Sequence, residues 1–270
     1  MQPRKRFGQH FLHDPAIIGR ILAALDAQPG QAWVEIGPGL GALTAPLLER
    51  VGVLHAIELD RDLIEPLHAR CAGLGTLHLH QADALRFDYC ALAATLGTDT
   101  RLRLVGNLPY YISTPLLFHL LDQTRCVHDM HFMLQREVVE RMTAAPGSKR
   151  YGRLTVMLAA RCRVEGLFRI AAGAFNPPPR VESAYARITP WREPPFVIAD
   201  AELYARVVTL AFSKRRKTLR NALAGLVGAQ TMVARGIDPG ARPETLSAAQ
   251  FAALAQPDPQ GKRVYCARSE

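Results

Sequence analysis

The stretch GNLPYYIST, residues 106–114, places an amide, a proline and two tyrosines directly after the apolar, β-prone run RLRLV. The side-chain carbonyl of Asn107 and the backbone carbonyl of Leu108 could each accept one hydrogen of an exocyclic amine such as that of adenine. Pro109 fixes the turn because its ring restricts φ, and Tyr110 offers a flat face on which an extruded base stacks. The motif suits the positioning of a purine amine toward an activated methyl carbon. Asn-x-Pro followed by tyrosine is also an ordinary turn sequence.

A second motif, VEIGPGLGALT, places Gly37, Gly39 and Gly41 between a short buried strand and a helix. Such a loop lets a ligand approach the backbone at the carboxyl end of a parallel sheet. The spacing is G-x-G-x-G, whereas a pyrophosphate cradle has G-x-G-x-x-G. The loop therefore favours S-adenosylmethionine, which has no phosphate. A nicotinamide dinucleotide, or a tight turn without any ligand, is the alternative.

Acidic residues end the next two predicted strands. Glu58 follows Gly37 by 21 residues, and a carboxylate there can accept hydrogen bonds from both hydroxyls of a ribose. Asp83 is placed to meet the amine of an adenine. Both residues could instead cap the helices that follow them. Together with the glycine loop, the two acids indicate a cofactor that contains adenosine.

Strand-like and helix-like segments alternate over the first two thirds of the chain. Apolar runs predict strands over 31–37, 53–60, 76–85, 101–107 and 126–135. Helical spacing predicts helices over 17–28, 43–51, 61–72 and 136–145. This alternation is typical of a mostly parallel, doubly wound α/β sheet.

The pattern changes after residue 160. Two further strands, over 161–170 and 182–191, flank the loop AAGAFNPPPR, which its three prolines make extended and stiff. PWREPPF, residues 190–196, indicates a linker, and the segments beyond it are helical, over 200–212, 216–227 and 247–255. We therefore predict a catalytic domain over 1–190 and a small all-α domain over 191–270, with Ser247 as an N-cap.

The chain of 270 residues carries a net charge of +9, and from Val181 onward it has 13 Lys/Arg against 8 Asp/Glu. Clustered guanidinium and ammonium groups suit the phosphate backbone of folded RNA, although a charge run is also compatible with a simple solvated face. The residues expected to contact RNA are the SKRRKTLR cluster and the basic N-terminal RKR: Lys214, Arg215, Arg216, Lys217, Arg220, Arg4, Lys5 and Arg6.

The cysteines, the apolar runs and the histidines exclude several classes of protein. The five cysteines lie far apart without a C-x-x-C pair, which argues against a structural zinc site and a disulfide framework and favours a reducing cytoplasm. No apolar run is long enough to span a bilayer, and the N-terminus lacks a secretion signal. The nine histidines are scattered, so general-base catalysis finds no support, and nothing suggests more than a monomer.

Seven stretches in one order carry a family resemblance: FGQHFL, VEIGPGLGALT, ELD, ADAL, GNLPYYIST, FNPPPRVESA and FSKRRKTLRNAL. Together they resemble the ribosomal RNA adenine N6-dimethyltransferases of the small subunit, the KsgA/RsmA family, over about residues 4–254. The resemblance implies a Rossmann-like class I methyltransferase fold, with S-adenosylmethionine as cofactor. It also implies dimethylation of two adjacent adenosines in a hairpin near the 3′ end of 16S rRNA, and a role in subunit biogenesis.

The resemblance also implies roles for individual residues. Cofactor contacts fall on His10, Leu12, Gly37, Glu58, Asp83 and Asn107. Contacts to the target adenine fall on Asn107, Leu108, Pro109 and Tyr110, with Phe175 of FNPPPR against the other face of the base. Two positions depart from the family pattern. His10 replaces the usual asparagine of G-Q-N-F-L, and Tyr111 replaces a frequent asparagine, where it either extends the stacking surface or packs inward.

Three alternatives stay open at this point. A sister enzyme could methylate an adenosine of the large-subunit RNA, although FSKRRKTLRNAL and the GID…RPETLS segment favour the small-subunit branch. A ribosome-assembly factor could bind the same RNA chiefly as a scaffold. A dinucleotide oxidoreductase would fit the glycine loop but lacks a candidate hydride-transfer site.

Overall fold

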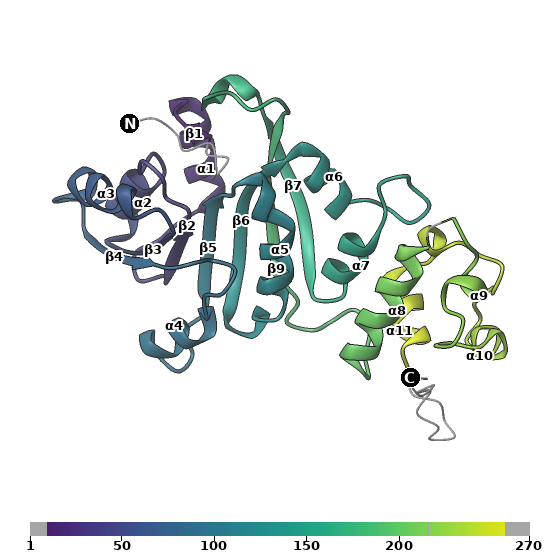
Figure 1. Ribbon diagram of the computed structural model, residues 1–270. Coiled ribbons are helices and arrows are strands. Elements are labelled where there is room, and N and C mark those ends of the chain that lie inside the picture. Colours follow the sequence, from purple (N-terminus) through teal and green to yellow (C-terminus); the bar gives the residue numbers. More distant parts are fainter. Residues whose placement is uncertain (1–9, 215, 257–270) are drawn as a thin grey trace. The chain divides into compact units, whose positions relative to one another are not determined.

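Seven strands form one mixed sheet in the computed structural model of the protein, which describes residues 10–214 and 216–256. The strands lie in the order β4 (Thr76–Gln81), β3 (Val53–Glu58), β2 (Trp33–Ile36), β5 (Leu102–Asn107), β6 (Val127–Gln135), β9 (Ser183–Pro190) and β7 (Cys162–Ile170). The first five are parallel to their neighbours, and β9 runs antiparallel to β6. The predicted doubly wound α/β sheet is confirmed (Figure 1).

The order of the strands reverses between β2 and β5. From β2 the chain builds outward to β3 and β4, then returns to place β5 on the other side of β2. In an open α/β sheet, ligands bind in the crevice outside the carboxyl ends of the strands at such a reversal. The segments that follow β2 and β5 are the glycine loop and the Asn107 motif, so the topology brings these two sequence motifs together.

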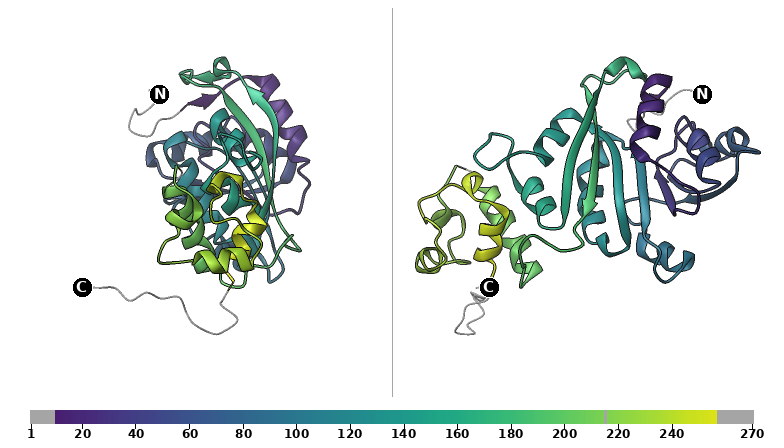
Figure 2. Two further views of the ribbon diagram at one scale, coloured as in Figure 1. Left: turned by 90° about the vertical axis from the view of Figure 1, so that its right-hand side faces the viewer. Right: turned by 180° about the vertical axis from the view of Figure 1, so that it is seen from behind.

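Helices cover both faces of this sheet. Apolar side chains of α1 (Pro15–Leu25), α2 (Thr44–Val51) and α3 (Ile64–Cys71) share one buried cluster with strand residues such as Leu54 and Val105. The helix α5 (Tyr110–Leu121) lies in front of the sheet in Figure 1, and α1 comes to the front when the molecule is seen from behind in Figure 2. Each βα unit thus buries one apolar stripe against the strands.

The sequence did not predict several short elements. In the first unit they are β1 (Phe11–Leu12), β8 (Phe175–Asn176), α4 (Tyr89–Leu96) and α5, with the 3₁₀ turns Thr124–Cys126 and Ala172–Ala174. The helix predicted over 61–72 begins as the 3₁₀ turn Arg61–Leu63 and continues as α3. The strands β1 and β8 pair antiparallel through two residues each, Phe11 with Asn176 and Leu12 with Phe175. This pairing joins the start of the described chain to the proline-rich loop.

The chain divides into two compact units, Met1–Val139 with Val164–Pro190, and Glu140–Arg163 with Trp191–Glu270. The sequence placed one boundary at residue 190, whereas the second unit also takes the segment Glu140–Arg163. This segment holds α7 (Arg153–Ala159), and its Tyr151, Val156 and Ala160 share a buried cluster with the helices beyond residue 200. Because this apolar surface is buried with the later helices, it belongs to their core.

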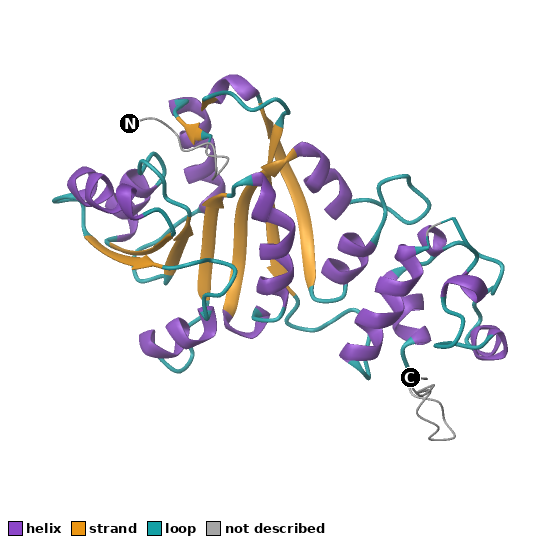
Figure 3. Ribbon diagram, in the orientation of Figure 1, coloured by secondary structure: helices purple, strands orange, loops and turns teal. Residues whose placement is uncertain are grey.

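After residue 191 the described chain consists of helices and loops, drawn purple and teal in Figure 3. The elements there are α8 (Ala201–Ser213), α9 (Leu219–Ala222), α10 (Ala229–Ala234), a 3₁₀ turn at Pro243–Thr245 and α11 (Ala248–Leu254). Ser247 is the N-cap of α11, since its hydroxyl accepts a hydrogen bond from the Gln250 amide at 3.2 Å. The predicted helix over 216–227 is reduced to the four residues of α9.

The remaining helix, α6 (Arg136–Met142), follows β6, and the boundary between Val139 and Glu140 falls within it. Within the residues that the structure describes, no helix has the length and apolar character needed to cross a bilayer.

Candidate active site

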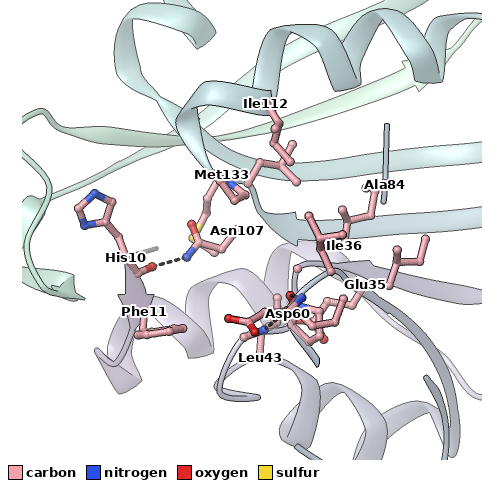
Figure 4. A pocket seen from close by; sticks show the side chains of 18 of the residues that line it. His10, Phe11, Glu35, Ile36, Leu43, Asp60, Ala84, Asn107, Ile112 and Met133 are labelled. Carbon is pink, nitrogen blue, oxygen red and sulfur yellow. Dashed lines mark hydrogen bonds between the residues drawn. The ribbon is translucent and has the colours of Figure 1, made fainter. Parts of the chain in front are cut away.

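A cavity of about 220 Å³ opens at the carboxyl ends of β2, β3 and β5. Its lining contains every cofactor-binding residue expected from the sequence: His10, Leu12, Gly37, Gly39, Glu58, Asp83 and Asn107. Leu108, Pro109 and Tyr110 of the adenine-holding motif line it as well. Residues from separate stretches of the sequence therefore share one cavity, part of which is drawn in Figure 4.

The glycine loop runs close to the first described strand. Gly39 has a φ of +57°, a conformation that residues with a Cβ adopt reluctantly, and a Cβ there would lie 3.1 Å from the ring of Phe11. Gly106 is equally constrained, because a Cβ would lie 2.5 Å from the carbonyl oxygen of Ile36. Gly39 thus lets the loop approach β1, and Gly106 lets β5 approach the end of β2.

The Glu58 carboxylate is buried at the end of β3, with its orientation fixed by the backbone. Its Oε1 accepts a hydrogen bond from the Asp60 amide at 2.9 Å, and its Oε2 accepts one from the Gly39 amide at 3.3 Å. Burial raises the pKa of this carboxyl, and the two amides oppose that shift. Asp83, just beyond the end of the neighbouring strand β4, accepts from the Leu85 amide through Oδ1 at 2.9 Å.

Glu35 is a cavity residue that the sequence interpretation missed. It lies within β2, is only 2% exposed, and its Oε2 has no hydrogen-bond partner among the described residues. Burial, and to a smaller extent the Glu58 charge, raises the pKa of this carboxyl from 4.5 to about 7, although the neighbouring Thr44 hydroxyl opposes the shift. The signal in the sequence was an acid inside an otherwise apolar strand, two residues before the glycine loop.

Asn107 is held in one orientation. Its Nδ2 donates a hydrogen bond to the backbone carbonyl of His10 at 2.7 Å, drawn as a dashed line in Figure 4. The amide nitrogen is thus committed, and Oδ1 is the atom of this side chain that remains as an acceptor. The next residue, Leu108, is buried, and its amide donates to the Met133 carbonyl at 3.3 Å.

Pro109 and Tyr110 begin α5 at the cavity. Pro109 is the N-cap, with a φ of −55°, and Tyr110 is the first helical residue. The Tyr110 hydroxyl lies 2.7 Å from the Ser183 hydroxyl on β9, which anchors the half-buried ring at its far end. Burial raises the pKa of this phenol, so it is neutral at physiological pH.

Two aromatic residues differ in their placement. Tyr111 is 55% exposed and lines the cavity, so it does not pack inward. Phe175 is 2% exposed and is not among the lining residues; it packs in the buried cluster that also contains Leu12 and Tyr185. The pairing of β8 with β1 directs Phe175 into this core, so the structure does not bring it to the cavity as the sequence interpretation expected.

The basic cluster occupies a loop of the second unit. Lys214 follows α8, and Arg216 and Lys217 precede α9, while Arg220 lies within α9; all four are exposed. The turn closes through a hydrogen bond from the Lys217 amide to the Lys214 carbonyl at 2.8 Å. The expected RNA contacts at Arg215, Arg4, Lys5 and Arg6 lie outside the described residues.

Two cysteines lie close together in the structure, and so do three histidines, although their separations along the sequence did not predict these contacts. Cys90 and Cys126, 36 residues apart, form a disulfide, whereas the spacing of the cysteines argued against a disulfide framework. Three histidines of β3 and β4 also meet: the rings of His55 and His78 stack at 4.6 Å, and His55 Nδ1 lies 3.0 Å from His80 Nε2. None of these three belongs to the residues that line the cavity.

Comparison with known proteins agrees with this arrangement. The model of the family "Ribosomal RNA adenine dimethylase" matches residues 1–257. A ribosomal RNA small subunit methyltransferase A of Nitrosococcus oceani is 55% identical over 251 residues, which cover 93% of this chain and 94% of that protein. The enzyme of the same name in Pseudomonas aeruginosa is 52% identical over 252 residues, covering 93% of each chain.

Solved structures show the same fold. A dimethyladenosine transferase from Plasmodium falciparum superposes with a TM-score of 0.75 at 24% identity, covering 91% of this chain and 96% of that one. The 23S rRNA methyltransferase ErmE gives a TM-score of 0.71 at 24% identity, with 91% and 98% covered. The doubly wound sheet, which here has a cavity at its reversal, is shared with these solved methyltransferases, and together with the matched family it places the chain among the class I methyltransferases. Within that class, the chain belongs to the ribosomal RNA adenine dimethylase family.

Proposed function

We propose that the protein transfers methyl groups from S-adenosylmethionine to the N6 amines of two adjacent adenosines, in a hairpin near the 3′ end of 16S rRNA. The observation that carries this proposal is the fixed amide of Asn107. Its nitrogen is bound to the His10 carbonyl, so its oxygen is presented at a cavity that also holds buried acids. The close relatives named as small-subunit methyltransferases support the choice of RNA.

The chain's residues fit the proposed cofactor. Glu58 and Asp83 each keep acceptor capacity beyond their backbone contacts, for ribose hydroxyls and for the adenine amine respectively. Glu35 has an unpartnered, buried carboxylate oxygen, which matches the ammonium group of the methionine part. A nearby cation would favour the ionised form of this carboxyl. A dinucleotide fits less well, because the loop spacing lacks the phosphate-binding pattern.

The target amine has a lone pair delocalised into the adenine ring, which makes it a poor nucleophile. Asn107 Oδ1 and the Leu108 carbonyl each accept one hydrogen of the amine, and this holds the nitrogen with its lone pair directed into the cavity. S-adenosylmethionine supplies, when bound, a methyl carbon activated by a positively charged sulfur. When N6 takes the methyl group, the carbon–sulfur bond would break to leave a neutral thioether, and the acidic proton of the methylated amine would pass to solvent. Positioning therefore provides most of the rate, and no side chain has to act as a strong base.

Tyr110 supports the base from one face. Stacking of a base on an aromatic ring stabilises binding by about 1–3 kcal/mol, and the hydrogen bond to Ser183 keeps the ring in place. The target base has to leave its stack to reach this surface. Phe175 lies in the core, so on this proposal it supports Leu12 and β1.

The basic loop of the second unit is the proposed contact to RNA phosphates. Lys214, Arg216 and Lys217 are exposed within four residues. Replacing all three by glutamine should weaken RNA binding and reduce the slope of log affinity against log salt by about 2–3, because each phosphate contact contributes roughly 0.7–0.9. An unchanged slope would remove this loop from the interface.

The proposed function is tested by mapping transferred methyl groups. The protein is incubated with tritiated S-adenosylmethionine and either unmodified small subunits or large subunits. We expect label on two adjacent adenosines of 16S rRNA and none on the large-subunit RNA. Asn107→Ala should still bind small subunits while losing methyl transfer. Label confined to the large subunit would overturn the substrate assignment, and full activity of the variant would overturn the mechanism.

A further inference from the structure

His10 connects three segments that lie far apart in the sequence. Its backbone carbonyl accepts the hydrogen bond from Asn107 Nδ2, and its ring Nδ1 lies 2.7 Å from the Pro177 carbonyl, 167 residues away. Its ring centroid is also 5.6 Å from that of Tyr110. The residue before β1 therefore touches both the adenine-holding motif and the proline-rich loop after β8.

The bond to Pro177 shows that ring nitrogen Nδ1 carries a proton. A carbonyl oxygen only accepts hydrogen bonds, so Nδ1 has to carry the proton and donate it. The strands β1 and β8 share only two residue pairs, supplemented by the His13 amide on the Ala174 carbonyl at 3.0 Å. Because this ladder is short, the side-chain bond of His10 adds to what holds the segment in place, alongside the burial of Leu12 in the core.

We propose that His10 is a positioning residue that acts through Asn107, and that its side chain does not bind the cofactor. By clamping β1 to Pro177, the ring keeps the His10 carbonyl where it can hold the Asn107 nitrogen, and this presents Oδ1 to the target amine. In Figure 4 the imidazole points away from Asn107, whereas the backbone carbonyl points toward it. This inference rests on the proposed function, because it assigns a task within the same reaction.

The geometry also explains why histidine can replace, at position 10, the asparagine that is usual in the family. The Nδ1 of histidine and the Nδ2 of asparagine occupy the same δ position, two bonds from Cβ. Both can present an N–H to the Pro177 carbonyl. What position 10 requires is a donor at δ, and aspartate would place an acceptor-only oxygen against the same carbonyl.

Four variants of the full chain test this requirement: His10→Asn, His10→Asp, His10→Ala and, as a control, His13→Ala, whose exposed side chain lies in the same segment. Methyl transfer to unmodified small subunits gives kcat and KM, and calorimetry with S-adenosylhomocysteine gives Kd. We expect His10→Asp and His10→Ala to lower kcat by at least about tenfold, because a misplaced acceptor costs rate. Their Kd should stay within about twofold, and His10→Asn and His13→Ala should match the wild type.

Other outcomes overturn the inference. A weaker Kd in His10→Ala with unchanged kcat would make the ring a cofactor ligand. A loss in His10→Asn equal to that in His10→Ala would exclude the δ donor as the requirement, and so would unaltered kcat in His10→Asp. Should His10→Ala fail to fold, the comparison of the asparagine and aspartate variants still decides. A wild-type protein that methylates neither subunit would instead refute the proposed function itself.

Discussion

Two buried ionisable residues, Glu35 and His55, lie on the neighbouring strands β2 and β3, and burial shifts their pKa values in opposite directions. Burial raises the pKa of Glu35, at the cavity, to about 7. Burial, together with the neighbouring His78 and His80, lowers the pKa of His55 to about 4. In both places the uncharged form is favoured, because a low-dielectric surrounding disfavours charge. A perturbed pKa alone therefore does not distinguish a functional site.

The difference lies in what surrounds each group. His55 Nδ1 is paired with His80 Nε2 at 3.0 Å, and its ring stacks on that of His78, so His55 has both a hydrogen-bond partner and a stacking partner. Glu35 Oε2 has no partner among the described residues, and Glu35 lines a cavity. An unsatisfied buried acceptor beside an open volume indicates a place for a ligand donor.

The largest effect is expected for Glu58→Gln. The carboxylate is proposed to accept two ribose hydroxyls, and bonds to a charged acceptor contribute about 1.5–3 kcal/mol, so we expect roughly 100-fold weaker binding of S-adenosylhomocysteine. Calorimetry measures this directly. Glu49→Gln, at an exposed position of α2, is the control and should bind as the wild type does. Equal affinities for both variants would remove the cavity from the cofactor-binding role.

Glu35→Gln should weaken ligand binding and at the same time stabilise the fold. With a folded-state pKa near 7 and an ordinary value of 4.5, the folded protein retains a proton that the unfolded chain has released. The free energy of unfolding therefore falls as pH rises through this window. We expect the variant to gain about 2 kcal/mol at pH 8 and to lose about tenfold in affinity through the lost ammonium contact. Urea unfolding at pH 5 and pH 8 measures the first effect, and a variant with wild-type pH dependence would contradict it.

His55→Leu should change stability in acid and leave ligand binding intact. The folded-state pKa near 4 lies below the ordinary 6.5, so between these values the unfolded chain binds more protons. The free energy of unfolding of the wild type consequently falls as pH drops through this window. The substitution should remove about 1–2 kcal/mol of that acid sensitivity, measured by urea unfolding at pH 4.5 and pH 7. His68→Leu, at an exposed position of α3, is the control.

The two pH windows overlap with opposite signs, so the wild-type protein should show a flatter profile than either variant. Glu35→Gln should expose the loss of stability in acid that His55 causes. His55→Leu should expose the loss toward neutral pH that Glu35 causes. Identical profiles for both variants would mean that the two regions do not titrate as their burial indicates.

Sequence patterns predicted the residues that depend on strand ends and failed for those that depend on distant contacts. Gly37, Glu58 and Asp83 were placed correctly in one cavity because parallel strands present their carboxyl ends at one edge. The meeting of His55 with His78 requires the register of β3 against β4, which spacing along the chain does not contain. The burial of Phe175 likewise follows from its pairing with Leu12, 163 positions earlier in the sequence.

Hydrogen bonds to distant residues also limited what the helical periodicity of the sequence could predict. The helix expected over 216–227 has good periodicity, yet only Leu219–Ala222 is helical. The Leu219 amide donates to the Ala241 carbonyl and the Arg220 amide to the Pro239 carbonyl, so tertiary contacts replace helical ones at its start. Glu35, by contrast, was visible as an acid in an apolar strand, and the rule that buried charges need a reason would have found it.

The smallest effect is expected for His78→Gln, and it tests which cause dominates in the histidine cluster. Burial is the larger cause of the lowered pKa of His55, ahead of the charges on His78 and His80. His78 is exposed, so its repulsion is screened by water and should contribute only about 0.5 kcal/mol. The variant should therefore keep most of the acid sensitivity that His55→Leu removes. If urea unfolding at pH 4.5 instead showed equal effects for the two substitutions, repulsion rather than burial would control the imidazoles. The parallel with Glu35, whose pKa is raised mainly by burial, would then fail.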